Sequence, residues 1–268
     1  MAAAGHPVPA MTLHYDDAGR AAVVMEHLDG APLSALAASG DDRFAPVLGD
    51  VAGRLAVLTT ATAVPAAGAE AAQALQTPGV TAAWARDVAA ALAPWAGSAI
   101  WLNGRPLGLT PGQVTRAALR LAGQPPAVLA LSSGDLHLGN ILVAPRSQRW
   151  HLIDLEFAGL HDPDRVTAGL LASLLKHARL ITSATADTAG GEILVTARLR
   201  DDLAWQLLGT PSLFGALAAG ACDPARVFAF MAVSLRFRLA AGPPGALPPA
   251  FALAMLALAA RMTGQDRP

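Results

Sequence analysis

The spacing of apolar residues divides the chain into a short β segment followed by helical stretches. Residues 12–28 read as two strands joined by a turn at 16–19, because Asp and Gly accept the backbone angles of tight turns. Beyond Gly30, apolar residues recur every three or four positions, which places them on one face of a helix. These residues are Phe44, Val47, Leu48, Val51, Leu55 and Leu58. The pattern predicts a hairpin followed by a long helix that is buried along one side.

Two further helical stretches are predicted in the first half of the chain, at residues 81–95 and 111–122. The second begins with Thr110 as its cap and Pro111 in its first turn, two residue types that favour a helix start. The prolines at 125 and 126 end it, because proline cannot continue a helix.

The second half of the chain is predicted as short strands and then helices. Apolar runs that read as strands lie at 127–131, 140–144 and 150–157. From Asp164 onward the pattern is helical, over roughly 164–181, 191–208, 224–241 and 247–262. We therefore expect any polar chemistry to lie in the loops between the strands.

Composition narrows the classes of function. The chain has 268 residues, 53% of them apolar, which is enough for a substantial core. Its formal charge is -1 and it has no run of Lys or Arg, so we expect no nucleic-acid partner. The apolar window at 251–260 is half the length that spans a bilayer, and the N-terminus lacks a signal-peptide pattern. These features predict a cytoplasmic protein without a membrane partner.

Four polar side chains stand in apolar surroundings in the predicted loops. The stretch LSSGDLHLGNILV, residues 131–143, contains Asp135, His137 and Asn140, and Asp154 follows in IDLEFAG. Oxygen ligands from Asp and Asn suit a hard cation such as Mg²⁺, which takes its remaining ligands from water and phosphate. A carboxylate outside the metal site can accept a proton from an attacking hydroxyl. The alternative is that Asp and Asn serve as loop caps and turn residues.

These stretches resemble a family signature. GDLHLGNILV, followed by IDLEFAG and HDP, is similar to the motifs of the aminoglycoside and choline kinase group of small-molecule phosphotransferases, distant relatives of the protein kinases. The resemblance implies an α+β, protein-kinase-like fold that uses ATP and Mg²⁺. Carried over by position, Asp135 is the catalytic base and His137 lies beside the transferred phosphoryl group. Asn140 and Asp154 are the magnesium ligands.

The same resemblance extends to the N-terminal part of the chain. VVMEHLDGAPL, residues 23–33, looks like the hinge of these enzymes, where backbone groups of Glu26, His27 and Leu28 hold the adenine. It implies that residues 1–28 are a remnant of the N-terminal β lobe with the hinge strand. Residues 29–268 are then the mostly helical C-terminal lobe. The resemblance covers about residues 12–175.

Three departures from the family pattern bear on activity. Ser133 stands where most members have His. Val166 stands where an Asp normally ties a helix to the catalytic loop, so this tie is absent or supplied by Asp164. No glycine-rich loop or lysine precedes the hinge, and the only lysine, Lys176, lies past the metal loop. Loss of a positively charged side chain that contacts the phosphates commonly lowers the rate of such reactions by about a thousandfold or more.

Several functions remain open from sequence alone. The first is a phosphotransferase acting on a hydroxyl of a small metabolite. The second is a non-catalytic kinase-like lobe that binds a ligand, or that uses a partner chain or a dimer to cover the hairpin and complete its small lobe. A third reading is that the missing lobe is encoded upstream. Residues 165–268 carry ten Lys and Arg against six acids, which favours a neutral or anionic acceptor over an aminoglycoside.

Overall fold

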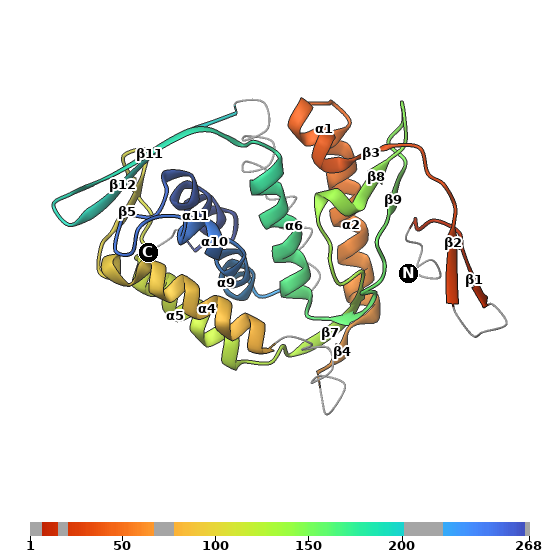
Figure 1. The fold of residues 1–268 in the computed structure, drawn as a ribbon, viewed down its shortest axis with the longest axis horizontal. Helices are drawn as coiled ribbons and strands as arrows, with labels where there is room; N and C mark the ends of the chain where they lie inside the picture. Colours follow the sequence, from red (N-terminus) through yellow and green to blue (C-terminus); the bar gives the residue numbers. More distant parts are fainter. Residues whose placement is uncertain (1–6, 16–20, 67–77, 201–221, 266–268) are drawn as a thin grey trace.

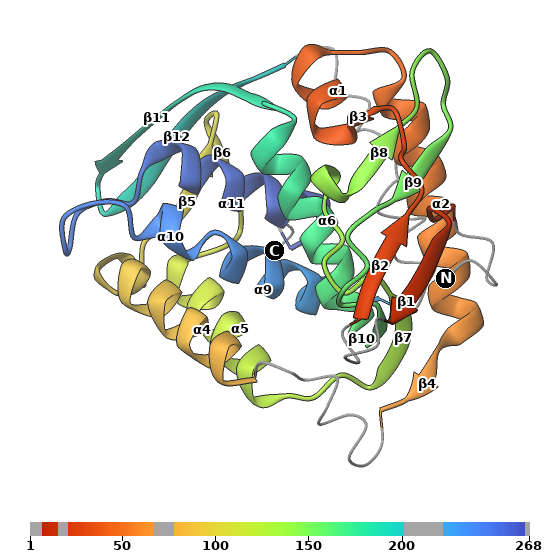
Figure 2. The same ribbon diagram turned by 45° about the vertical axis from the view of Figure 1, so that its right-hand side comes forward.

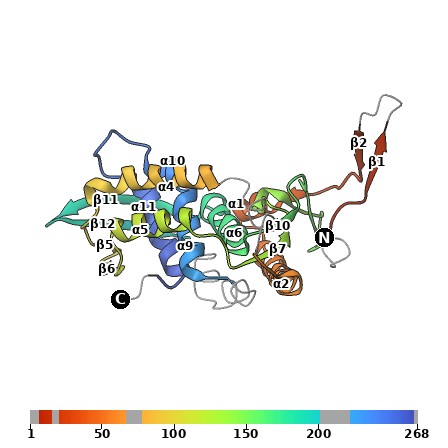
Figure 3. The same ribbon diagram turned by 90° about the horizontal axis from the view of Figure 1, so that it is seen from below.

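The computed structural model describes residues 7–15, 21–66, 78–200 and 222–265, and the chain begins with a β-hairpin. Strands β1 (Met11–Tyr15) and β2 (Ala21–Met25) pair antiparallel, with Met11 opposite Met25. The predicted hairpin is confirmed, although its turn lies outside the described residues. Figure 3 shows the hairpin at one end of the molecule, away from the helices.

A long buried helix follows the hairpin, as predicted. After β3 (Ala31–Pro32) and α1 (Leu33–Ser39), helix α2 runs from Phe44 to Thr62. All six apolar residues of the predicted stripe are buried on it. Of the described helices, α2 alone is long and apolar enough to cross a membrane, which is weak evidence because the core helix of a soluble protein has the same features.

Two small sheets lie beside α2 and hold the loops that carry the polar motifs. In the first, β7 (Val128–Ser132) pairs with β4 (Val64–Pro65) on one side and β10 (Gly159–His161) on the other. In the second, β8 (Ile141–Val143) pairs with β3 and with β9 (Trp150–Leu152). The strands are short, so the end of each strand leads directly into a loop.

The remaining helices form the larger part of the molecule. They are α4 (Pro78–Leu92), α5 (Pro111–Gly123), α6 (Pro163–His177), α9 (Pro224–Ser234), α10 (Arg236–Leu239) and α11 (Ala250–Met262). Thr110 and Gln113 form the capping box that begins α5. Figure 1 shows α6 in the middle, with α1 and α2 on one side and α9 to α11 on the other. One hydrophobic core joins both sides through α6.

The prediction of a helix at 191–208 is wrong for the part that the structure describes. Strands β11 (Ile181–Ala189) and β12 (Glu192–Leu199) form a long hairpin there, which Figure 2 shows along one flank. Burial alternates along β12, as expected for a strand with one face on the core. Gly190 and Gly191 both have positive φ, which suits the tight turn of a hairpin. Residues 201–208 lie outside the described residues.

The β11–β12 hairpin is attached to the body through a small sheet. β12 pairs in parallel with β5 (Ile100–Leu102), which in turn pairs with β6 (Arg105–Pro106). The expectation of a helical pattern with short breaks from Asp164 onward is therefore wrong at this hairpin. The mixed helix and sheet content agrees with the α+β fold.

Candidate active site

The loop between β7 and β8 holds three of the predicted site residues in a compact turn. Its last part is the 3-10 helix η3 (Leu138–Asn140), in which Leu138 is fully buried. His137 caps this turn, because its Nδ1 accepts a hydrogen bond of 3.0 Å from the Gly139 amide. The Asn140 amide donates to the His137 carbonyl at 3.0 Å. The loop conformation is thus set by local hydrogen bonds of the motif itself.

Asn140 also fixes Asp135. Its Nδ2 donates a hydrogen bond of 3.0 Å to the backbone carbonyl of Asp135. This bond uses the amide nitrogen, so the side-chain oxygen of Asn140 stays available to a cation. The carboxylate of Asp135 is 57% exposed, and its Oδ2 lies 3.7 Å from Nε2 of His137. Asp135 therefore presents an accessible proton acceptor beside the imidazole.

Asp154 lies next to Asn140. The Ile153 amide donates to the Asn140 carbonyl at 2.9 Å, which extends the antiparallel pairing of β8 with β9 by one step. Asp154 follows directly and has a φ of 58°, a left-handed backbone that is uncommon for residues other than glycine. Such conformations cost free energy and gather at functional sites. The structure places Asp135, His137 and Asn140 in one loop, and Asp154 directly after the residue whose amide is hydrogen-bonded to Asn140.

The donors at this site fit Mg²⁺ better than a transition metal. No group of three or more His, Cys, Asp or Glu side chains capable of holding a metal occurs in the part of the chain that the structure describes. Mg²⁺ does not need such a group, because it usually binds one or two carboxylates together with water and substrate phosphates. The exposed carboxylate of Asp154 and the amide oxygen of Asn140 match this pattern.

Helix α6 supports the loop through Ser173, a residue that the sequence analysis missed. Its Oγ accepts a hydrogen bond of 3.0 Å from the buried Leu138 amide. A serine on the buried face of a helix was the available signal, but its partner lies 35 residues away in sequence. Ser173 thus joins α6 to the loop through a hydrogen bond.

The sequence left open whether Asp164 replaces the family's Asp that joins a helix to the catalytic loop. In the structure the hydrogen bonds of the Asp164 carboxylate go elsewhere. Its two carboxylate oxygens accept from the Asp223 amide and from Nε of Arg226, each at 2.7 Å. Asp162 binds Nη2 of the same Arg226 at 2.5 Å. Burial and the charge of Asp162 raise the pKa of Asp164 to about 6. Asp164 therefore connects α6 to the start of α9.

Ser133, which replaces the usual His, is 2% exposed, and its Oγ is a buried atom without a hydrogen-bond partner in the described structure. The next residue, Gly134, is also constrained. It has a φ of +80°, and a Cβ there would lie 2.4 Å from the Phe157 carbonyl oxygen. His161 Nε2 bonds the same oxygen at 2.6 Å. The segments before Asp135 and after Asp154 are therefore in close contact at Gly134.

Replacing Gly134 with alanine is expected to destabilise the protein by about 2 kcal/mol or more and to distort the loop. The left-handed backbone alone costs roughly 1–2 kcal/mol for a residue with a Cβ, and the overlap with backbone adds to it. Gly104→Ala is the matched control, because Gly104 has a φ of +72° but open space around its Cβ position. Urea unfolding of both variants measures the difference. Equal losses would show that the contact with Phe157 does not matter.

The predicted adenine-binding residues lie in the connection between β2 and β3. The Glu26 amide donates to the Ala10 carbonyl at 2.8 Å, so this amide is already occupied. His27 and Asp29 form an exposed pair at 3.3 Å. No hydrogen bond joins Glu26, His27 or Leu28 to residues 134–140 within the described residues. The structure therefore leaves their carbonyl groups and the amides of His27 and Leu28 as the available contacts.

Comparison with known proteins gives matches to phosphotransferases. A family model described as the phosphotransferase enzyme family matches residues 1–172. A search of curated proteins found no match. A glucosamine kinase structure, crystal form B, aligns with a TM-score of 0.54 at 15% identity, over 89% of this chain and 62% of that chain. A glucosamine kinase in complex with glucosamine, ADP and inorganic phosphate gives a TM-score of 0.53 at 15% identity, with 89% and 61% covered.

At this level of identity the structural likeness shows a shared fold, which is the protein-kinase-like fold that the motifs imply. The chain spans about three fifths of the length of these glucosamine kinases.

Proposed function

Because this chain belongs to the phosphotransferase enzyme family, we propose that it transfers the γ-phosphoryl group of ATP to a hydroxyl of a small metabolite in the presence of Mg²⁺. The observation that carries the proposal is the 2.9 Å bond from the Ile153 amide to the Asn140 carbonyl, which makes the loop of Asp135 and Asn140 a neighbour of the segment that carries Asp154. The acceptor is proposed to be neutral or anionic, in line with the positive balance of residues 165–268.

In the proposed reaction Asp135 is the base. Its carboxylate takes the proton of the acceptor hydroxyl while the hydroxyl oxygen forms a bond to the γ-phosphorus. The bond from that phosphorus to the β–γ bridging oxygen breaks, and ADP leaves with the bonding electrons. His137, whose Nε2 lies 3.7 Å from Oδ2 of Asp135, is proposed to face the transferred group. Asn140 and Asp154 would hold Mg²⁺, which would supply positive charge to the phosphate oxygens when bound.

The nucleotide base is proposed to bind at the connection between the two parts of the chain. The available backbone groups of Glu26, His27 and Leu28 are the proposed adenine contacts. In this proposal residues 1–28 are the remnant of the N-terminal lobe with the hinge strand, and residues 29–268 are the helical lobe.

A second candidate function is a kinase-like lobe that acts only with a partner chain or in a dimer. Met11 and Met25 are each 50% exposed on the hairpin, where a partner could cover them. The segment before residue 26 contains no lysine to contact the phosphates. In this case the partner supplies that cation.

A melting experiment tests the magnesium site. Mg²⁺ with ATP is expected to raise the melting temperature of the wild-type chain, because a ligand at 100 times its Kd stabilises by about 2.7 kcal/mol. Asp154→Asn should remove the part of this increase that depends on Mg²⁺. Asparagine also tolerates the left-handed backbone, so the variant tests the charge rather than the conformation. The measurement is differential scanning fluorimetry with ATP, with and without Mg²⁺.

Asp187→Asn is the charge-matched control, since Asp187 lies on the distant β11–β12 hairpin. No increase in the wild-type chain would contradict nucleotide use by this chain alone and would favour the second candidate. An increase of the same size in Asp154→Asn would contradict the role of Asp154.

A further inference from the structure

A pocket of about 470 Å³ lies between α4, α10 and residues 242–248. Alanine, leucine and proline residues make up most of its wall. A volume in this range accommodates a small metabolite. None of the residues that line the pocket belongs to the segment 131–154, which carries the proposed phosphoryl transfer. The proposed function therefore does not account for this pocket.

The loop 242–248 on one side of the pocket is held by hydrogen bonds and by its composition. The Ala246 amide donates to the Pro243 carbonyl at 3.0 Å. Nε1 of Trp95, just past the end of α4, donates to the Ala246 carbonyl at 3.4 Å. Proline fixes φ at three positions of the loop. This wall of the pocket therefore loses little conformational freedom when a ligand binds.

Two aromatic rings hold Arg236 at the wall of the pocket. Its guanidinium carbon lies 3.5 Å from the centre of the Trp84 ring and 4.2 Å from that of Phe237. Trp84 packs in turn against the hydrophobic core, which anchors the stack. Nη1 of Arg236 donates to the Val233 carbonyl at 3.4 Å, and Nη2 makes no hydrogen bond in the described structure. A stacked arginine with an unused donor is well suited to bind a carboxylate.

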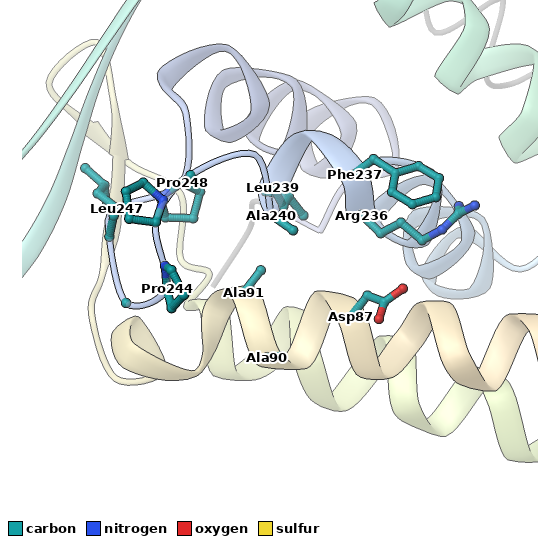
Figure 4. A pocket seen from close by; sticks show the side chains of 14 residues that line it. Asp87, Ala90, Ala91, Arg236, Phe237, Leu239, Ala240, Pro244, Leu247 and Pro248 are labelled. Carbon is teal, nitrogen blue, oxygen red and sulfur yellow. The ribbon is translucent and has the colours of Figure 1, made fainter.

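An acidic side chain lies on the facing helix. Figure 4 shows Asp87 on α4 facing Arg236 and Phe237 on α10. Asp87 is exposed, and no ion pair joins it to Arg236 within the described residues. Burial lowers the pKa of Arg236, and the charge of Asp87 offsets only part of this effect. The pocket therefore presents a cation and an anion on two walls that do not bind each other.

Phe237 gives the pocket an exposed aromatic surface. It lines the pocket beside Arg236, and 71% of it is exposed. Contact with an apolar group would remove part of this ring from water, which is favourable in proportion to the area covered. A ligand that fits the pocket therefore has an apolar part as well as charged groups.

We propose that this pocket binds a small zwitterion, namely an amino acid with an apolar side chain. Its carboxylate binds Nη2 of Arg236, its ammonium group binds Asp87, and its side chain packs against Phe237. A simple anion would bring its charge close to Asp87, and a simple cation would bring its charge close to Arg236, so the pair disfavours both. This inference goes beyond the proposed function and does not depend on it.

A purely structural role explains the pair less well. Stacking on Trp84 accounts for the position of Arg236 but not for an acid on the facing helix. A salt bridge between α4 and α10 would account for both residues, but the described structure contains no such bond. A ligand that binds both residues accounts for their facing positions.

Binding of three matched probes to the full chain tests the site. L-phenylalanine carries both charges and a ring that can pack on Phe237, hydrocinnamate lacks the ammonium group, and phenethylamine lacks the carboxylate. Isothermal titration calorimetry at low salt, without nucleotide or Mg²⁺, measures each affinity. The wild-type chain should bind L-phenylalanine at least about tenfold more tightly than either analogue, because each analogue loses a charged contact.

Two variants separate the two charged contacts. Asp87→Asn should weaken L-phenylalanine binding about tenfold without weakening the binding of hydrocinnamate. Arg236→Gln should weaken the binding of both carboxylates about tenfold without weakening that of phenethylamine. Because Asp87 is exposed, Asp87→Asn should keep the wild-type fold, so the test stands even if Arg236→Gln loses stability with its aromatic stack.

Arg238→Gln is the control, because it removes an exposed charge from α10 at a residue that does not line the pocket. It should change each affinity by less than about twofold. Absence of L-phenylalanine binding up to about 10 mM would overturn the proposal. So would equal affinity for the three probes, or L-phenylalanine binding that Asp87→Asn leaves unchanged.

The outcome is independent of the proposed function. L-phenylalanine has no hydroxyl that could accept a phosphoryl group, and the titrations contain no nucleotide. L-phenylalanine binding in a chain that ATP and Mg²⁺ do not stabilise would support the zwitterion site and contradict the kinase function alone. Stabilisation by ATP and Mg²⁺ in a chain that does not bind L-phenylalanine would contradict the zwitterion site alone.

Discussion

Replacing Asp135 with asparagine is expected to lower kcat for phosphoryl transfer by about 10² to 10⁴, the usual contribution of a general base. The fold should be preserved, because the carboxylate is 57% exposed and its contact is with His137 at 3.7 Å. The bond from Asn140 goes to the backbone carbonyl of Asp135, which the substitution keeps. ADP release in the presence of the acceptor measures the rate, and a thermal melt measures the fold.

The nucleotide melting experiment on the same variant is the internal control. Asp135→Asn should keep the stabilisation by ATP and Mg²⁺, since Asp135 is proposed to act on the acceptor rather than on the metal. An unchanged kcat would remove Asp135 from the base role. A large fall in melting temperature would indicate that Asp135 is structural.

Replacing Arg226 with methionine is expected to lower the free energy of unfolding by about 3–5 kcal/mol, because it leaves two buried carboxylates without their partner. The side chains of Asp162 and Asp164 are 7% and 8% exposed, and Arg226 binds both. Urea unfolding at pH 7 measures the loss. Arg116→Met, at an exposed position, should change stability by no more than about 0.5 kcal/mol.

The same measurement near pH 4.5 checks the cause. The pKa of Asp164 is raised from 3.8 to about 6, so the folded protein keeps this proton to higher pH than the unfolded chain does. The stability that protonation of Asp164 contributes is fully present below the pKa of this group in the unfolded chain. It is lost as the pH rises through about 6, the pKa of Asp164 in the folded protein. The penalty of Arg226→Met should therefore be smaller near pH 4.5 than at pH 7. A penalty independent of pH would point to lost packing instead.

Local patterns in the sequence were sufficient for much of the fold. The stripe from Phe44 to Leu58 predicted α2, because helical periodicity depends only on neighbouring residues. The cap at Thr110 predicted the start of α5 for the same reason. The motif around Asp135 and Asn140 carries its own hydrogen bonds, so its turn could be recognised from spacing.

The missed features depend on partners that are distant in sequence. β12 owes its strand conformation to pairing with β11 and with β5, and its Ala and Leu residues resemble those of the neighbouring helices. Ser173 and Arg226 act on residues 35 and 62–64 positions away. No local pattern marks such contacts, so the support of the loop by Ser173 and the pairing of Arg226 with two carboxylates appeared only in the structure.

Helix α6 has a consequence for the position of the proposed base. Ser173 joins it to the loop that carries Asp135, and Asp164 in its first turn binds Arg226 of α9. Both contacts are therefore mounted on one rigid helix. A displacement of α9 would then shift the loop as well, so the alignment of Asp135 with an acceptor would depend on a contact made far from the reacting groups.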